Sequence, residues 1–165
     1  MKTISRSELI KRCDRLRQTC ARYEGAKRKG GDWFNTCVTC GKTILCKNAN
    51  GGHFCPRSCY PLRWDERNVH CQCVHCNLYK NGAYIEYSQW FIDKYGKEVY
   101  DRYVNTYREW QKGSLPATKM NELRDTYDYW LKKGRELEKK VGPLFPKTWK
   151  PFGPDFQEVP VDKKR

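Results

Sequence analysis

The hydrophobic pattern near the start of the chain predicts a single amphipathic helix that ends at about Tyr23. Its start is marked by Ser5–Glu8, which has the Ser-x-x-Glu order of a capping box. An apolar stripe then recurs at alternating spacings of four and three, as expected for one helix face: Leu9, Cys13, Leu16, Cys20 and Tyr23. Cysteine at two of these positions acts as a small buried hydrophobe. The stripe either packs on the chain's own C-terminal helices or forms the seam of a coiled-coil homodimer.

Helical periodicity returns in the second half of the chain. Aromatic and aliphatic residues from Tyr87 to Trp110 follow a helical period that Gly96 interrupts, so two helices are expected there. A last helix is expected from Thr118 to about Lys140. Residues 142–165 contain five prolines and should be extended, either packed on the body or free of it.

The stretch between these helices is typical of short strands. Glycine, proline and asparagine surround short apolar pieces in residues 41–72, which predicts a β-hairpin with a long irregular loop. We therefore expect an α+β protein in four parts, with a small core flanked by helices. The parts are a basic N-terminal helix (1–30), the core (31–85), a helical region that packs on the core (86–141) and an extended tail (142–165).

The charge balance indicates a polyanionic partner. The net charge is +14 and the sequence pI is about 9.4, and residues 1–30 alone hold ten Lys and Arg against three acids. DNA is the simplest such partner, and an ordinary solvated helix face is the alternative. No apolar run is long enough for a membrane span, and residues 1–10 lack the apolar core of a secretory signal. We expect a cytoplasmic protein with no membrane partner.

Ten cysteines in a chain without a secretory signal favour metal binding over disulfides. Two CxxC pairs have the spacing of zinc knuckles: Cys37 with Cys40, and Cys73 with Cys76. Two such turns together complete a tetrahedral four-sulfur site for structural Zn²⁺, and iron would fit the same thiolates. Four further cysteines could form a second zinc site: Cys46, Cys55, Cys59 and Cys71.

A histidine and two asparagines occur in a suggestive order around the knuckles. His53 lies between the two CxxC pairs, Asn68 precedes the second pair, and Asn77 directly follows Cys76. A neutral imidazole can take a proton from water, and an asparagine oxygen suits Mg²⁺, which keeps most of its own water ligands. A single histidine or asparagine of this kind is more often structural, but the joint order favours a hydrolytic site.

This arrangement resembles the HNH, or ββα-metal finger (His-Me finger), nucleases that carry a four-cysteine zinc site. The resemblance implies that His53 is the general base, that Asn68 positions it, and that Asn77 binds a catalytic Mg²⁺ or Mn²⁺. Many members of that family have aspartate just before the base, where this chain has Gly52. It is therefore more similar to the branch with a DRGH-type motif, in which one asparagine holds the metal.

A more specific resemblance covers residues 37–104. The run Glu66-Arg67-Asn68-Val69-His70-x-Gln72-Cys73-Val74-x-Cys76-Asn77 resembles the NinG/Rap recombination proteins of lambdoid phages. That resemblance implies a structure-specific DNA endonuclease that cleaves branched DNA, such as Holliday junctions and D-loops, in the host bacterial cell. The alternatives are a zinc-stapled DNA-binding protein without catalysis, and an HNH endonuclease of restriction or homing type. Two symmetric cuts in a junction would favour a homodimer.

Several other polar residues near Asn68 could assist the reaction. If residues 68–72 form a strand, Glu66, Asn68 and His70 share one face, and His70 could then contact phosphate or metal. Arginine pairs with phosphate through two parallel hydrogen bonds, so Arg57, Arg63 and above all Arg67 are candidates. Lys80 follows Asn77 by three residues and is a candidate contact to the DNA backbone.

Overall fold

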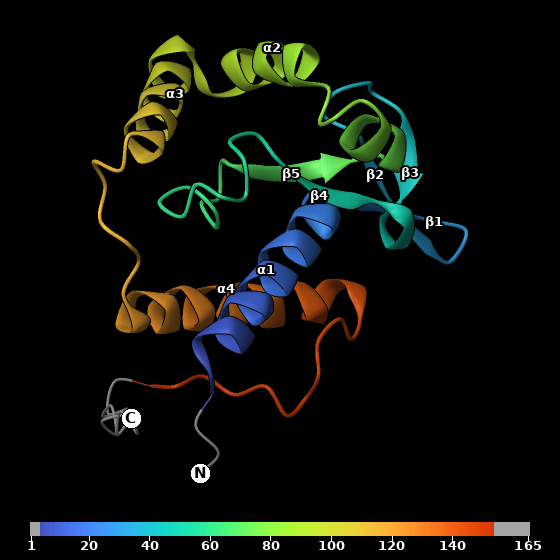
Figure 1. The fold of residues 1–165 in the computed structure, drawn as a ribbon. Helices are drawn as coiled ribbons and strands as arrows, with labels where there is room; N and C mark the ends of the chain where they lie inside the picture. Colours follow the sequence, from blue (N-terminus) through green and yellow to red (C-terminus); the bar gives the residue numbers. More distant parts are fainter. Residues whose placement is uncertain (1–3, 154–165) are drawn as a thin grey trace.

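The computed structural model describes residues 4–153 and shows a mixed α+β chain with helices at both ends of the sequence (Figure 1). The helices are α1 (Arg6–Tyr23), α2 (Tyr84–Tyr95), α3 (Lys97–Gln111) and α4 (Met120–Val141), with short turns η1 (Cys46–Asn48) and η2 (His75–Tyr79). The strands are β1 (Lys27–Lys29), β2 (Asp32–Thr36), β3 (Thr43–Leu45), β4 (Asn50–His53) and β5 (Val69–Gln72). None of the helices in this range is both long and apolar enough to cross a membrane.

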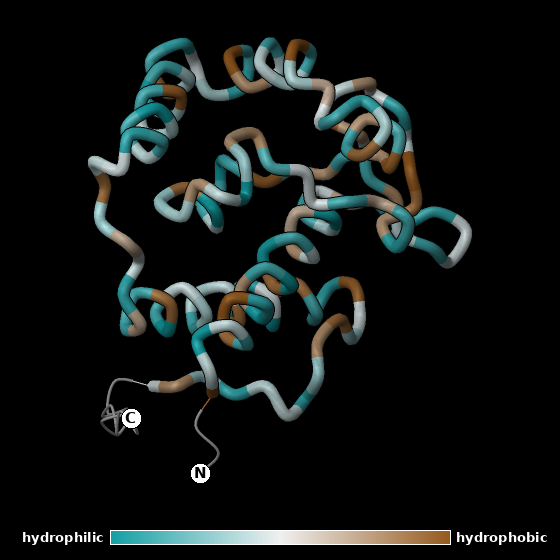
Figure 2. The backbone as a smooth tube through the Cα atoms, in the orientation of Figure 1, coloured by the Kyte–Doolittle hydropathy of each residue, from teal (hydrophilic) through white to brown (hydrophobic). Residues whose placement is uncertain are grey.

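The first helix packs on the last one. Ser5 caps α1, because its hydroxyl accepts a hydrogen bond from the Glu8 amide at 3.2 Å. Brown bands recur between teal ones along α1 and α4 (Figure 2), and the apolar faces of the two helices form one core: Leu9, Cys13, Leu16 and Cys20 against Leu123, Tyr127, Trp130 and Leu131. The predicted stripe is thus used within the chain, and any homodimer would have to form through another surface.

The extended tail is packed on the body as far as it is described. Phe145 is 6% exposed and belongs to the core between α1 and α4, where its ring lies against Gly134. The end of the predicted tail, residues 154–165, lies outside the described residues. The last helix begins at Met120, and the cap is Lys119, whose amide donates to the Glu122 carboxylate at 2.7 Å; Thr118 is not the cap.

Two small antiparallel sheets make up the middle of the chain. One has the order β1-β2-β3, and the other pairs β4 with β5, so that Gly52 faces His70 and His53 faces Val69. The predicted boundary at residue 30 falls inside the turn between β1 and β2. There Gly30 and Gly31 both have positive φ, +56° and +89°, as a two-residue hairpin of the type I′ class requires.

The β4–β5 hairpin is fastened to α2 through His70. Tyr87 donates its hydroxyl hydrogen to the Gly52 carbonyl at 3.0 Å, so its oxygen accepts from His70 Nδ1 at 2.8 Å. Nε2 of His70 then accepts from the Tyr95 hydroxyl at 2.8 Å. Burial lowers the pKa of His70 to about 3, and the imidazole is neutral at physiological pH. His70 is a structural bridge, and both ring nitrogens are engaged by tyrosines.

We expect this bridge to make folding sensitive to acid. The folded pKa of His70 is lowered, so the unfolded state binds the proton more tightly, and the free energy of unfolding should fall as pH drops below about 6.5. His70→Gln keeps one donor and one acceptor but does not titrate. In urea unfolding at pH 7, 6, 5 and 4, the free energy of unfolding should fall less steeply with decreasing pH for His70→Gln than for the parent. Between pH 7 and pH 4 the parent should lose about 3 kcal/mol more than the variant. Parallel curves would contradict the assignment.

Candidate functional site

Four cysteines from two distant parts of the chain converge on one point. The Sγ atoms of Cys37, Cys40, Cys73 and Cys76 all lie within 4.8 Å of one another. The Cys40 and Cys73 sulfurs are 3.8 Å apart, and tetrahedral ligands at the zinc–sulfur bond length are separated by about 3.8 Å. The donor set and its size therefore fit a structural Zn²⁺, and these four cysteines could hold such a metal.

Backbone turns shape both halves of this cluster. In the first knuckle the Gly41 amide donates to the Cys37 carbonyl at 2.9 Å, with Gly41 at a φ of +72°. In the second knuckle the Cys76 amide points at the Cys73 sulfur at 3.4 Å, which stabilises a thiolate. Burial raises the pKa of Cys37, but hydrogen bonds from Thr39 and nearby backbone groups outweigh it and bring that pKa to about 6.

The second zinc site is not formed. In the range 4–153 the structure contains one cluster of metal-ligating side chains, and the other four cysteines named for a second site are outside it. Cys55 and Cys59 lie among aromatic rings, and the Cys55 thiol donates to the Tyr103 carbonyl at 3.7 Å. Cys46 and Cys71 are also buried. Burial raises the pKa of Cys55 and of Cys71 to about 12, so these residues are neutral packing groups.

His53, the last residue of β4, has a defined tautomer. Its Nε2 lies 3.1 Å from the Arg63 carbonyl oxygen, which can only accept, so Nε2 carries the hydrogen. Burial lowers the pKa of His53 to about 4, so the ring is neutral at physiological pH. The Nδ1 atom therefore carries a lone pair that can accept a proton.

The carbonyl that orients His53 is itself held by α1. Asp14 binds the Arg63 guanidinium through two contacts, 2.9 Å to Nε and 2.6 Å to Nη2, and also accepts from the Trp64 indole at 2.9 Å. Arg63 and Asp14 are mostly buried, at 11% and 13% side-chain exposure. Arg63 is consequently a positioning residue for His53, and its guanidinium is unavailable for the phosphate contact predicted from the sequence.

Asn68 fixes the base of the long loop that follows His53. It is fully buried, and its amide accepts from the Cys55 backbone N–H at 2.7 Å and donates to the Cys55 carbonyl at 3.1 Å. These two bonds extend the β4–β5 pairing beyond the last strand residues. Asn68 acts on the backbone two residues after His53, and its side chain makes its hydrogen bonds to Cys55 and not to the imidazole.

Asn77 lies on the short turn η2 and shares a cavity with His53. The cavity has a volume of about 380 Å³, and its lining combines these two residues with tyrosine rings and loop atoms: His53, Phe54, Cys55, Pro56, Asn77, Asn81, Gly82, Tyr84, Tyr87, Val104 and Tyr107. The Asn77 backbone N–H donates to the Cys73 carbonyl at 3.0 Å, so the turn that carries Asn77 starts in the cysteine cluster. The structure thus brings His53 and Asn77 to one cavity.

Gly52, the residue before His53, packs closely against the Gln72 side chain. A side chain at Gly52 would place its Cβ only 1.8 Å from the Gln72 Oε1 atom, so aspartate there would require the Gln72 side chain to move. Gln72 is fully buried, and its amide donates to the Gly82 carbonyl at 2.8 Å. The departure from the HNH pattern at Gly52 is therefore built into the packing of β4 on Gln72.

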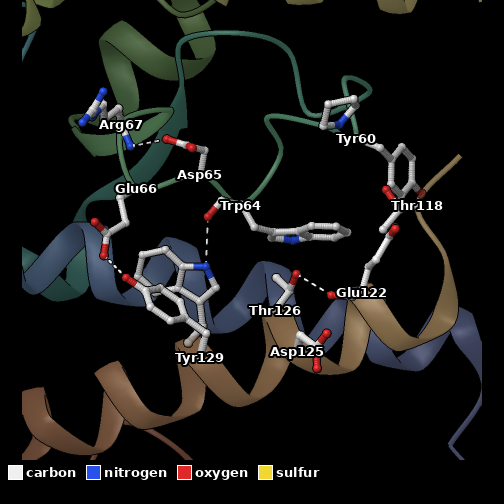
Figure 3. Close-up of a pocket in the computed structure, with 12 residues that line it drawn as sticks. Tyr60, Trp64, Asp65, Glu66, Arg67, Thr118, Glu122, Asp125, Thr126 and Tyr129 are labelled. Atoms are coloured by element: carbon white, nitrogen blue, oxygen red, sulfur yellow. Dashed lines mark hydrogen bonds between the residues drawn. The ribbon is translucent and has the colours of Figure 1, made fainter. Parts of the chain in front are cut away.

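Glu66 and Arg67 line a different cavity, of about 740 Å³, between the loop 60–67 and α4 (Figure 3). The Glu66 carboxylate accepts from the Tyr129 hydroxyl and pairs with Lys133 at 3.3 Å. The hydrogen bond from Tyr129 lowers the pKa of Glu66. Arg67 is the single cation among the residues that line this cavity. Four carboxylates line it as well: Asp65, Glu66, Glu122 and Asp125. Neither Glu66 nor Arg67 lines the cavity of His53 and Asn77.

A basic groove beside β4 was not singled out from the sequence. Its cavity of about 420 Å³ is lined in part by Asn50 and Gly51 of β4 and by one acid, Asp14. Four cations also line it: Lys11, Arg15, Arg22 and Arg57. The positive charge of Arg57 adds to the effect of burial and also lowers the pKa of the His53 imidazole. In the sequence, only the helical periodicity could have indicated which Lys and Arg of residues 1–30 share this face of α1. Lys80 lies apart from the groove and pairs with Glu86 at 3.8 Å.

Comparison with known proteins identifies the family. The family model described as "Bacteriophage Lambda NinG protein" matches residues 5–139. Curated relatives include "Protein ninG" of Escherichia phage 933W, 39% identical over 66 residues, which are 39% of this chain and 32% of the relative. "Protein ninG" of Salmonella phage P22 is 31% identical over 99 residues, 54% of this chain and 48% of the relative. The matches span about a third to a half of the relatives' lengths.

No solved structure matches this chain. The family model nevertheless covers α1, both sheets, the four-cysteine cluster and nearly all of α4. The chain belongs to the NinG family of bacteriophage proteins.

Proposed function

We propose that this protein is a metal-dependent DNA endonuclease of the HNH type that hydrolyses phosphodiester bonds in branched DNA, with His53 as the general base. The observation that carries the proposal is the neutral His53 ring, fixed through Nε2 with Nδ1 left as the acceptor, in one cavity with Asn77. The order of the elements supports it, because β4 and β5 form a hairpin that leads through the second knuckle into η2.

In this proposal His53 Nδ1 removes a proton from the attacking water. The Arg63 carbonyl keeps the ring from rotating and continues to accept the hydrogen bond from Nε2–H as the imidazolium forms. An incoming phosphodiester brings negative charge beside the ring and raises the pKa of His53 from about 4 toward the range in which a base is effective. Asn68 keeps the backbone after His53 in register while this happens.

Asn77 is the residue that would hold Mg²⁺ or Mn²⁺. Its amide oxygen is a hard ligand of the kind these cations prefer, and its neighbour Cys76 belongs to a soft sulfur cluster that does not suit them. A cation there would stabilise charge on the phosphate and on the leaving oxygen. Because Gly52 offers no carboxylate, this chain would supply one protein ligand to such a cation, and water would fill the remaining positions.

The basic groove suits the DNA backbone. Lys11, Arg15, Arg22 and Arg57 gather positive charge along α1 and beside β4, and phosphate contacts of this type fix position without reading sequence. A zinc-stapled DNA-binding protein without catalysis would explain the groove and the cysteines equally well. It would not require the neutral, oriented His53 ring in the cavity of Asn77, and this difference favours the enzyme.

Loss of a zinc ligand should unfold the core. Structural zinc contributes about 10–16 kcal/mol in zinc-finger peptides, comparable with the whole stability of a small domain. Cys76→Ser should therefore hold less than one zinc per chain and lose its cooperative thermal transition. Cys46→Ala, which alters a buried cysteine outside the cluster, serves as the matched control and should keep its zinc. Elemental analysis with circular dichroism makes the comparison, and a fully folded, zinc-free Cys76→Ser would contradict the structural role.

Replacing the general base should abolish cleavage but not folding. His53→Ala removes the proton acceptor, so the cleavage rate on a four-way junction with Mg²⁺ should drop by about 10²- to 10⁴-fold. DNA affinity and zinc content should match those of the parent. Arg57→Gln is the control, since it alters the basic groove and not the cavity of His53, and should weaken binding without abolishing the chemical step. A His53→Ala protein that cuts junctions as fast as the parent would overturn the assignment.

Replacing the metal ligand should change the response to Mg²⁺. With Asn77→Ala the Mg²⁺ concentration for half-maximal cleavage should rise by about tenfold or more, because the protein's own oxygen ligand is lost. Asn77→Asp restores a hard oxygen ligand and should recover metal dependence close to that of the parent. Titration of cleavage with MgCl₂ and MnCl₂ tests this. Loss of zinc from Asn77→Ala would instead assign Asn77 a structural role.

A further inference from the structure

Exposed apolar side chains are concentrated beside Asn77. In the part of the chain that the structure describes, six large hydrophobic side chains are exposed, and five of them belong to one segment, which we call the 74–85 segment: Val74, Leu78, Tyr79, Tyr84 and Ile85. Tyr79 is 77% exposed and Ile85 is 82% exposed. Brown bands mark the η2 turn and the start of α2 in Figure 2. Exposed apolar groups gathered in this way mark an interaction site.

The segment is continuous with the cavity of His53 and Asn77. The turn η2 carries Asn77 together with Leu78 and Tyr79. Tyr84 lines the same cavity and is 52% exposed. Its ring lies parallel to that of Phe54, with centroids 5.7 Å apart and an interplanar angle of 8°. Phe54 in turn stacks on Phe91 at 4.2 Å. A column of rings thus runs from the core to the surface beside the cavity.

We propose that the 74–85 segment receives unpaired nucleobases at a DNA branch point, with the exposed Tyr79 as the stacking ring and the exposed Leu78 and Ile85 as further apolar contacts. The inference rests on the proposed endonuclease function and names the surface that would select branched DNA over intact duplex. Base faces are hidden in a paired duplex and become available only where strands separate, so aromatic and aliphatic side chains can read that difference. The basic groove alone cannot, because phosphates are present in both forms.

A second copy of the chain is a weaker match for this surface. The five side chains together offer on the order of 500 Å² of accessible area, below the roughly 800 Å² that each partner buries in a standard interface. Two chains with a net charge of +14 each also repel one another. The same charge attracts a polyanion, so the charge and the apolar surface together favour DNA with exposed bases.

The test compares branched with fully paired DNA in the absence of cleavage. The full-length, zinc-loaded protein is mixed with a forked DNA that carries 2-aminopurine at the branch point, with Ca²⁺ in place of Mg²⁺. A duplex of equal length with paired 2-aminopurine is the reference. For Tyr79→Ser combined with Ile85→Ser, affinity for the fork should fall about tenfold. Affinity for the duplex should change less than about twofold, and the fluorescence change at the branch point should disappear.

Two further variants act as controls. Tyr79→Phe keeps the ring and should restore both fork affinity and the fluorescence change. Tyr129→Ser alters an exposed tyrosine outside the 74–85 segment and should behave like the parent. Zinc content and circular dichroism check that each variant is folded.

Three results would overturn the inference: no loss of fork affinity, an equal loss for fork and duplex, or a dimer-to-monomer change in light scattering with DNA affinity unchanged. A protein that selects the fork through Tyr79 but cuts no DNA with Mg²⁺ would support the inference and refute the proposed catalysis. The two failures are therefore distinguishable.

Discussion

The buried guanidinium of Arg17 is the contact on which the rest of the structure depends. It is fully inaccessible and donates to the backbone carbonyls of Asp65, Glu66 and Val69. It also lies over the Trp130 ring, 4.4 Å from its centroid. A charge can be buried only when its donors are engaged, so one side chain from α1 fixes the approach to β5 and contacts α4 at the same time. The other elements are arranged around that junction.

The geometry of His53 depends on Arg17 and on Asp14, which lies one turn earlier in α1. Asp14 and Arg17 are three residues apart and so lie on one face of α1. Asp14 holds Arg63, whose carbonyl orients His53, while Arg17 holds Val69, which pairs with His53 across the hairpin. Both ends of the segment 63–69 are thus attached to the same helix. The N-terminal helix, which the sequence presents as a basic arm, is the support on which the candidate site is built.

Residue patterns predicted those features that depend on local spacing. The cap at Ser5, the buried stripe of α1 and the clustering of the two CxxC pairs all follow from periods of a few residues. The features that were missed depend on tertiary contacts. Nothing in the sequence distinguishes Arg17 from its solvated neighbours. Because β5 begins at Val69 and its pairing continues only as far as Asn68, the period-two argument does not extend to Glu66. The cysteines assigned to a second zinc site fill gaps among apolar side chains instead.

The distribution of charge matters more to this protein's interactions than its total. One groove along α1 presents Lys11, Arg15, Arg22 and Arg57 with one carboxylate. The cavity between the loop 60–67 and α4 has the opposite balance, with four carboxylates and one arginine. A polyanion is repelled from the second and attracted to the first, and it would therefore be drawn to the face of β4 that ends in His53. For the proposed DNA partner, a net charge of +14 would give attraction without direction, and the acidic cavity would disfavour binding to its own surface.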